Sequence, residues 1–198
     1  QAAQRALMTA VAVVGAFLLG RLLTFSARRS APAPMTAHFS QLTFSRGVES
    51  QPSLSPDGRS FVYVSAAGGE QGDIYLQRVG GENAVNLTPD SKEDDWSPVY
   101  SPDGQWIAFR SEREGKGIFV MGATGESVHR VADFGFNPAW SPDGKELVVA
   151  TEGLTDPTAR NSVSQLWRID VMTGAKKQIP IKGDAVQPNW SPHGKRIA

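Results

Sequence analysis

The sequence of 198 residues has no cysteine, no net charge and none of the short motifs of common hydrolases. Without cysteine, the chain can form no disulfide, no cysteine-ligated zinc site and no thiol nucleophile. Its 20 basic and 20 acidic residues balance, so it lacks the excess of positive charge that binds nucleic acid. We therefore expect no nucleic-acid partner for this chain.

Catalytic and metal-binding patterns are also missing. Neither a Gly-x-Ser-x-Gly elbow nor a His-Glu-x-x-His helix is present. His38, His129 and His193 are far apart and fall in a predicted linker, strand and turn. The acidic run at residues 90–95 could bind a cation, but such a run is typical of a solvated loop. We predict no catalytic residue, no metal site and no cofactor.

One long apolar run is present, over residues 6–25, with Arg21 as its only charge. About twenty apolar residues in a helix span the hydrocarbon core of a bilayer. An arginine near the helix end can extend its side chain to the interface. The run therefore predicts one transmembrane helix, by which the protein would be anchored in a membrane.

Two alternatives for this run stay open. Residues 6–20 have the length of the apolar region of a signal peptide, although the nearest candidate cleavage site, at residues 31–33, is rich in proline. A helix buried in a soluble core is the other. On the transmembrane interpretation, residues 1–5 are a stub on the cytoplasmic side. Residues 26–38, rich in alanine, proline and serine, form an extended linker to a folded domain over residues 39–198.

The strongest pattern is an internal repeat with a spacing of roughly 40–50 residues. A Ser-Pro-Asp-Gly motif occurs three times and returns once with histidine in the third place: Ser55-Pro56-Asp57-Gly58, Ser101-Pro102-Asp103-Gly104, Ser141-Pro142-Asp143-Gly144 and Ser191-Pro192-His193-Gly194. A proline precedes each motif serine by three residues, at Pro52, Pro98, Pro138 and Pro188.

Each motif is followed by two β-rich runs, a glycine turn and a last short β-rich run. Four strands in a unit of roughly 40–50 residues are typical of a β-propeller blade. The units show no helical periodicity, which excludes a helical solenoid. We predict an all-β fold, a partial β-propeller of three to four four-stranded blades, with blades at residues 51–88, 97–132 and 137–181 and the start of another at 187–198. Residues 39–44 are predicted as a leading strand.

The repeated motif has a structural explanation. Proline in the second place presets φ for a type I turn, and glycine in the fourth adopts the positive φ that closes a hairpin. Asp57, Asp103 and Asp143 could alternatively form a metal or catalytic cluster. That interpretation is weak because they fall in separate blades and His193 replaces the fourth. We interpret all four motifs as structural turns between the first two strands of a blade.

A protein or small-molecule ligand of the propeller would bind at surface residues outside the repeat. Trp96 lies outside the predicted strands, unlike the four tryptophans at repeat positions that we assign to blade packing: Trp106, Trp140, Trp167 and Trp190. The longest insertion between strands, residues 152–164, contains Asp156 and Arg160. Insertions of this kind often carry function. Trp96, Asp156 and Arg160 are the candidate contact residues.

Residues 39–198 resemble the WD40-like repeats of TolB-type β-propellers, whose pattern is Pro-x-Trp-Ser-Pro-Asp-Gly-Lys-x-Ile-Ala-Phe. Within that family, residues 110–127, 165–167 and 183–188 are similar to a branch found in bacterial receptor serine/threonine kinases. The resemblance implies an N-terminal cytoplasmic kinase, one transmembrane helix and an extracytoplasmic, periplasmic propeller. A close relative has a winged-helix regulator in place of the kinase.

No kinase motif occurs in this chain, so a kinase parent would carry its catalysis before Gln1. The main hypothesis is therefore a non-catalytic sensor or binding propeller of a single-pass membrane protein. The alternatives are the propeller of a prolyl-oligopeptidase-type serine peptidase, which a Gly-x-Ser-x-Gly elbow downstream would support, and a TolB-like periplasmic scaffold protein.

Overall fold

The structure is a computed structural model that describes residues 39–44, 47–67, 71–153 and 162–198, together with Gly15, Ala37 and Gly69. Residues 1–40 and 41–198 form two separate units, and every strand below belongs to the second. The predicted transmembrane helix lies outside the described residues, apart from Gly15, which is helical. No helix within the described residues has the length and apolar character needed to cross a bilayer.

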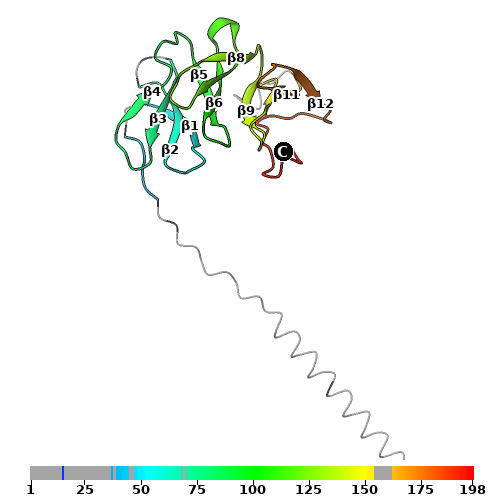
Figure 1. The fold of residues 1–198 in the computed structure, drawn as a ribbon, viewed down its shortest axis with the longest axis horizontal. Coiled ribbons are helices and arrows are strands. Elements are labelled where there is room, and N and C mark those ends of the chain that lie inside the picture. The colour runs from blue at the N-terminus through cyan, green and yellow to red at the C-terminus, as the bar shows by residue number, and fades with distance from the viewer. Residues whose placement is uncertain are drawn as a thin grey trace, which may run out of the picture. The chain divides into compact units, whose positions relative to one another are not determined.

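Twelve strands in the described residues form three four-stranded antiparallel sheets (Figure 1). The first sheet contains β1 (Glu49–Leu54), β2 (Ser60–Ser65), β3 (Asp73–Arg78) and β4 (Ala84–Asn86). The second contains β5 (Asp95–Tyr100), β6 (Trp106–Ser111), β7 (Gly117–Gly122) and β8 (His129–Ala132), with a short 3-10 turn, η1 (Arg113–Gly115), before β7. The third contains β9 (Phe136–Trp140), β10 (Glu146–Ala150), β11 (Leu166–Asp170) and β12 (Lys176–Ile179).

Each sheet is built from consecutive strands in chain order, as a propeller blade is. The first strands of successive sheets are neighbours, β1 beside β5 and β5 beside β9. A bridge between Trp190 and Ile197 begins a fourth unit. The prediction of an all-β, partial propeller with four strands per unit is confirmed, and we refer to the three sheets as blades 1, 2 and 3.

The repeated motif joins the first and second strands of each blade, as predicted. In blade 1 the Gly58 N–H donates to the Ser55 carbonyl over 2.8 Å, and Gly58 has a φ of 69°. The Ser55 hydroxyl donates to Asp57 Oδ1 over 2.6 Å and accepts from the Ser60 N–H over 3.0 Å. The fourth hairpin keeps the corresponding bond from the Arg196 N–H to the serine hydroxyl without an aspartate. The aspartate is therefore an addition to the turn and not a requirement.

Successive hairpins stack against one another. A Cβ atom at Gly104 would lie 3.4 Å from Cδ of Pro56, and one at Gly144 would lie 3.9 Å from Cδ of Pro102. The same relation holds for Gly194 and Pro142, at 3.8 Å. The glycines of the second, third and fourth hairpins thus face the proline of the preceding hairpin, whereas a Cβ atom at Gly58 of the first meets nothing within 4 Å.

The core lies in the seams between blades, because side chains along a strand alternate between its two faces. Val62 in β2 packs with Ile107 and Phe109 of blade 2 in one buried cluster. A second cluster joins blades 2 and 3 and includes Ile118 and Leu147. Each such fully buried aliphatic side chain contributes ~1.5–3 kcal/mol relative to its exposed state. The blades are therefore held together mainly by apolar contact across the seams.

A buried ion pair within blade 2 links the first residue of β5 to η1. The guanidinium of Arg113 donates to Asp95 Oδ2 over 2.6 Å, and the Asp95 side chain is completely buried. Burial raises the pKa of Asp95, while the hydroxyl of Ser111 and the charge of Arg113 oppose that shift. The pair fixes the position of η1 against β5.

Two expectations about local structure are wrong. Residues 39–44 form no strand, and the Leu42 carbonyl instead accepts a hydrogen bond from Gln77 Nε2 over 2.8 Å. Trp96 does not lie outside the strands, because it is part of β5 and pairs with Arg110. Strand β5 begins before the repeated proline, a position that the motif spacing does not reveal.

Candidate functional site

A polar groove of about 440 Å³ runs along the first strands of the blades. Every blade contributes the same stretch of its first strand, and the start of the fourth unit contributes its counterpart. We call this the axial groove, and define it by its lining residues: Gln51, Pro52, Ser97, Pro98, Val99, Tyr100, Asn137, Pro138, Ala139, Trp140, Gln187, Pro188 and Asn189.

A repeated backbone corner shapes the axial groove. The residue before each repeated proline has a positive φ: 53° at Gln51, 51° at Ser97, 49° at Asn137 and 53° at Gln187. This left-handed conformation is uncommon for residues other than glycine, and residues before proline are normally restricted to extended conformations. We call these four residues the corner residues.

The corner interrupts the regular pairing of the first strand of each blade with the second strand. The register of β1 with β2 shifts between Ser50 and Ser53, and that of β5 with β6 shifts between Trp96 and Val99. A bulge of this type bends a strand and redirects its side chains. A non-glycine residue held in this region costs of order 1–3 kcal/mol. The fold therefore keeps a strained conformation at the same place in successive blades.

Hydrogen bonds link the corner residues across the seams. The Ser97 N–H donates to Gln51 Oε1 over 2.7 Å, and the Ser97 hydroxyl donates to Asn137 Oδ1 over 3.3 Å. Blades 1 and 2 are linked further, because the Tyr100 N–H donates to the Ser53 hydroxyl over 3.1 Å. The groove is thus one connected polar surface across three blades.

Two aromatic residues form the less exposed part of the groove. Tyr100 and Trp140 are equivalent residues of blades 2 and 3, both buried, and Trp140 Nε1 donates to the Val99 carbonyl over 3.1 Å. Burial raises the pKa of Tyr100, so its phenol stays protonated at neutral pH. The lining contains no charged side chain and no histidine. Its chemistry is that of amides and hydroxyls, which can donate and accept hydrogen bonds but offer no acid–base pair.

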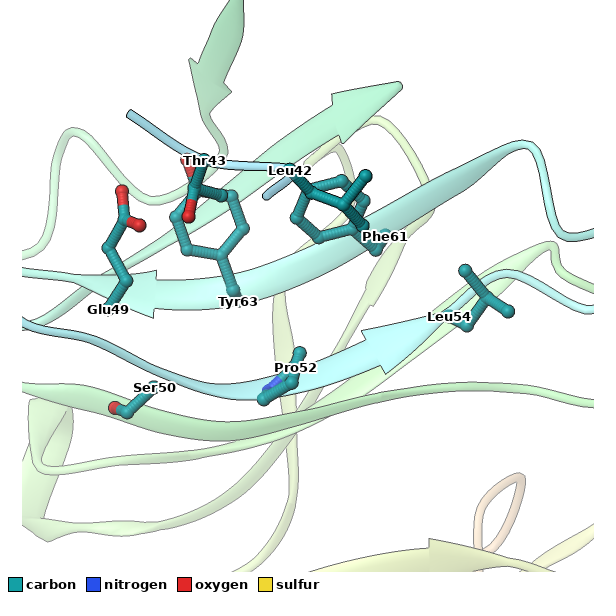
Figure 2. A pocket seen from close by; sticks show the side chains of 8 residues that line it. All are labelled: Leu42, Thr43, Glu49, Ser50, Pro52, Leu54, Phe61 and Tyr63. Atoms are coloured by element: carbon teal, nitrogen blue, oxygen red, sulfur yellow. The ribbon is translucent and has the colours of Figure 1, made fainter. Parts of the chain in front are cut away.

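A second hollow lies on the face of blade 1 that points away from blade 2 (Figure 2). It measures about 370 Å³, and Phe61 and Tyr63 of β2 form its base, with Leu42 above Phe61 and Leu54 at one side. The hollow is mainly apolar. Phe61 and Tyr63 alternate along β2 with Val62, which packs into the seam with blade 2. This face has the character of blade packing and not of a polar ligand site.

The structure places the predicted site residues apart from the axial groove. Asp57, Asp103 and Asp143 each bond to the serine of their own hairpin, and these bonds lower the pKa of all three carboxyl groups. No group of acidic or histidine side chains that could hold a metal ion occurs in the described ranges. Each of these three aspartates is thus hydrogen-bonded within its own hairpin turn.

The candidate contact residues are not brought together. Asp156 and Arg160 lie outside the described residues. Trp96 is half-buried, and its indole nitrogen lies 3.5 Å from the position that a Cβ atom would take at Gly72 of blade 1. Of the tryptophans assigned to blade packing, Trp140 is buried, whereas Trp106 is 40% exposed.

Sequence reasoning missed the corner residues. Their signal was present, because each stands four residues before a hairpin serine and directly before the repeated proline. The prolines form an evident repeat, but the preceding positions differ in residue type: Gln51, Ser97, Asn137 and Gln187. What these positions share is a backbone conformation and an uncharged polar side chain.

Comparison with known proteins identifies close counterparts of this fold. The sequence model described as "TolB beta propeller domain" matches residues 35–156. The crystal structure of TolB from Acinetobacter baumannii superimposes with a TM-score of 0.64 at 25% identity, covering 78% of this chain and 38% of that one.

Two curated relatives have similar sequences. A protein of Agrobacterium fabrum without an assigned function is 31% identical over 153 residues, covering 73% of this chain and 52% of its own length. Dipeptidyl-peptidase 5 of Porphyromonas gingivalis is 31% identical over 144 residues, covering 64% of this chain and 20% of its own length. The chain thus spans about half or less of the length of these relatives.

Proposed function

Because the chain belongs to the TolB-type β-propeller family, we propose that it is a non-catalytic binding module whose axial groove holds a protein or small-molecule ligand. The observation that carries this proposal is the repeated corner. Four strained residues at equivalent positions present uncharged polar side chains to one groove. Strain retained at equivalent positions is typical of a functional surface.

The lining supports binding in preference to chemistry. Hydrolysis or group transfer needs a nucleophile beside a base, or a metal-bound water. The described lining has two hydroxyls: that of Ser97 donates to Asn137, and that of Tyr100 lies 3.5 Å from the Ser60 hydroxyl, so neither is paired with a histidine or carboxylate. Amide and hydroxyl groups beside buried aromatic rings and three buried prolines (Pro98, Pro138 and Pro188) are suited to a neutral, hydrogen-bonding ligand.

We propose further that this propeller is the extracytoplasmic sensor part of a single-pass membrane protein. The apolar run at residues 6–25 and the resemblance to receptor serine/threonine kinases support this arrangement. In it, binding at the axial groove would be communicated through the helix to a cytoplasmic kinase or winged-helix regulator. The sequence upstream of Gln1 tests this, since it must then encode one of those domains.

A peptidase parent is the second candidate, and the similarity to dipeptidyl-peptidase 5 favours it. In that case the propeller would accompany a hydrolase domain and control access of peptides to it. A Gly-x-Ser-x-Gly elbow downstream of Ala198 distinguishes this candidate from the sensor. A third arrangement, a TolB-like periplasmic scaffold, predicts neither an upstream kinase nor a downstream hydrolase.

Site-specific photocrosslinking in the full-length protein tests the binding function. We would replace Asn137 by p-benzoylphenylalanine and irradiate cells of the native host. The matched control places the same crosslinker at Met172 of blade 3, which is 92% exposed and outside the groove. We expect adducts, identified by mass spectrometry, at position 137 only. Equal labelling at both positions, or none at position 137, contradicts the proposal.

A further inference from the structure

A second polar cleft, of about 510 Å³, lies at the hairpin end of the seam between blades 1 and 2. We propose that it binds a small zwitterion with an amino and a carboxyl group, such as a free amino acid or a short peptide. Blade 1 contributes its hairpin and the end of β3, and blade 2 contributes its hairpin and the turn after β7. The cleft shares only Tyr100 with the axial groove.

One residue of blade 1 that lines the cleft is small. The fifth residue after each hairpin serine is Ser60, Trp106, Glu146 or Arg196. In blade 1 Ser60 lines the cleft, and its hydroxyl lies 3.5 Å from the Tyr100 hydroxyl. A tryptophan occupies the equivalent position of blade 2, so the repeat itself accepts a large side chain there. The equivalent hollow between blade 3 and the fourth unit, where Glu146 takes this position, is smaller, at about 300 Å³. A small residue here therefore goes with the larger space.

The charges on the two walls are complementary to a zwitterion. On the blade 1 wall, Arg59 lies 3.9 Å from Asp57, and the pair is solvent-exposed. Arg78, at the end of β3, is exposed and forms no ion pair within the part of the chain that the structure describes. One guanidinium on this wall is therefore available to a carboxylate ligand.

On the blade 2 wall, the carboxylate of Asp103 is available. Its Oδ1 accepts from the Ser101 hydroxyl over 2.5 Å and from the Gln105 N–H over 3.0 Å. These two bonds favour the ionised form, and they leave Oδ2 without a protein donor among the described residues. An ammonium group has the charge and the donors to bind there.

The cleft volume falls in the range of ligand sites, ~300–1,000 Å³, and it exceeds the needs of an amino acid or dipeptide. A ligand that bridges Arg78 and Asp103 uses both of its charged ends. A ligand that lacks one end leaves one of the two side chains unpaired and binds more weakly.

Isothermal titration calorimetry on the full-length protein tests this site, with L-alanine and L-alanyl-L-alanine as probes. N-acetyl-L-alanyl-L-alanine keeps only the carboxylate, and L-alanyl-L-alanine amide keeps only the ammonium. We expect saturable binding of a zwitterion and roughly tenfold weaker binding of each blocked peptide, since a charged contact is worth about one decade in affinity. Preference between alanine and dialanine identifies the free amino acid or the peptide as the ligand class.

Three variants locate the binding. Ser60→Trp fills the cleft with the residue that blade 2 itself has at this position, and it should abolish binding. Arg78→Gln removes the guanidinium from an exposed side chain, and it should weaken the zwitterion roughly tenfold while leaving the dialanine amide unaffected. The matched control, Trp106→Ser, changes the equivalent position of blade 2 and should bind as the wild type does. Thermal unfolding of each variant verifies that it is folded.

Several outcomes overturn the proposal. One is the absence of a saturable binding heat at probe concentrations up to ten times a dissociation constant of roughly 1 mM. Another is equal affinity for the zwitterion and both blocked peptides. Unchanged binding in folded Ser60→Trp and Arg78→Gln proteins excludes this cleft as the location. If Ser60→Trp does not fold, the Arg78→Gln result decides alone.

Discussion

The Ser97 N–H of blade 2 donates to the side-chain oxygen of Gln51 in blade 1, across a distance of 2.7 Å. Both residues have the same left-handed backbone conformation at equivalent positions of their blades. The side chain of one corner residue therefore satisfies the backbone of the next. This relationship links the axial groove to the stability of the seam, and it leads to the first prediction.

Gln51→Ala removes the acceptor for the Ser97 N–H. We expect the free energy of unfolding to fall by about 1 kcal/mol, the usual net contribution of one hydrogen bond. Urea denaturation of the full-length protein measures this change. Gln187→Ala is the matched control, because the Gln187 side chain forms no hydrogen bond with any residue that the structure describes. A loss as large in the control as in Gln51→Ala would refute the specific role of this bond.

Alanine substitutions at Gly117 and Gly58 distinguish the cost of steric crowding from the cost of backbone strain. Both have positive φ, 144° and 69°. A Cβ at Gly117 would lie 2.0 Å from the Ala132 carbonyl oxygen, whereas a Cβ at Gly58 meets nothing within 4 Å. We expect Gly58→Ala to cost about 1 kcal/mol and Gly117→Ala to cost more than about 3 kcal/mol. Equal thermal shifts for the two variants would show that the β7–β8 contact is less tight than described.

Asp103 should make a pH-dependent contribution to stability. Its hydrogen bond from Ser101 lowers the pKa of the carboxyl below the ordinary value of 3.8. The ionised form therefore stabilises the fold at and above pH 3.8, and this contribution is lost as the pH falls through the lowered pKa. Because the side chain is exposed, we expect Asp103→Asn to cost no more than about 1 kcal/mol at neutral pH.

Urea midpoints measured from neutral pH to about pH 2, below the ordinary pKa, test the Asp103 prediction. The midpoints of the wild type and Asp103→Asn should differ at neutral pH and converge in acid. A constant difference across the whole range would mean that ionisation of Asp103 has no part in it.

Arg113→Gln leaves the buried carboxylate of Asp95 without its cation. Breaking a buried ion pair from one side usually costs about 3–5 kcal/mol. We expect a loss of that size at neutral pH, smaller in acid because the raised pKa of Asp95 favours its neutral form once Arg113 is absent. The double variant Asp95→Asn with Arg113→Gln should recover part of the loss. Additive losses in the double variant would show that the two side chains are not coupled.

The blades could be predicted from the sequence because their signals are local. A hairpin such as Ser55–Gly58 contains in four residues the proline, the hydroxyl and the glycine that its turn needs. The β-rich run that follows, such as residues 61–64, then occupies one strand. Neither step depends on contacts between distant residues, so the repeat alone indicates the architecture.

The axial groove could not be predicted in the same way. Gln51 and Ser97 are brought together only when two blades pack, and their shared feature is a backbone angle that no residue type specifies. The position of Trp96 within β5 could not be predicted for a related reason. Strand β5 passes through the bulge, so the strand begins earlier than the repeated proline suggests. In both cases the missing information is the pairing of strands around an irregular position.

The repeated corner has a consequence for how such domains diversify. Glutamine, serine and asparagine all occupy it with φ between 49° and 53°, so the bend in the chain tolerates exchange of the side chain that it displays. If the axial groove binds a ligand as proposed, substitutions there would alter its preference one blade at a time while the hairpins stay as they are, at the cost of seam hydrogen bonds such as the one from Ser97 to Gln51. A set of variants randomised at Gln51, Ser97, Asn137 and Gln187 would thus be a compact starting library for engineering new recognition on this scaffold.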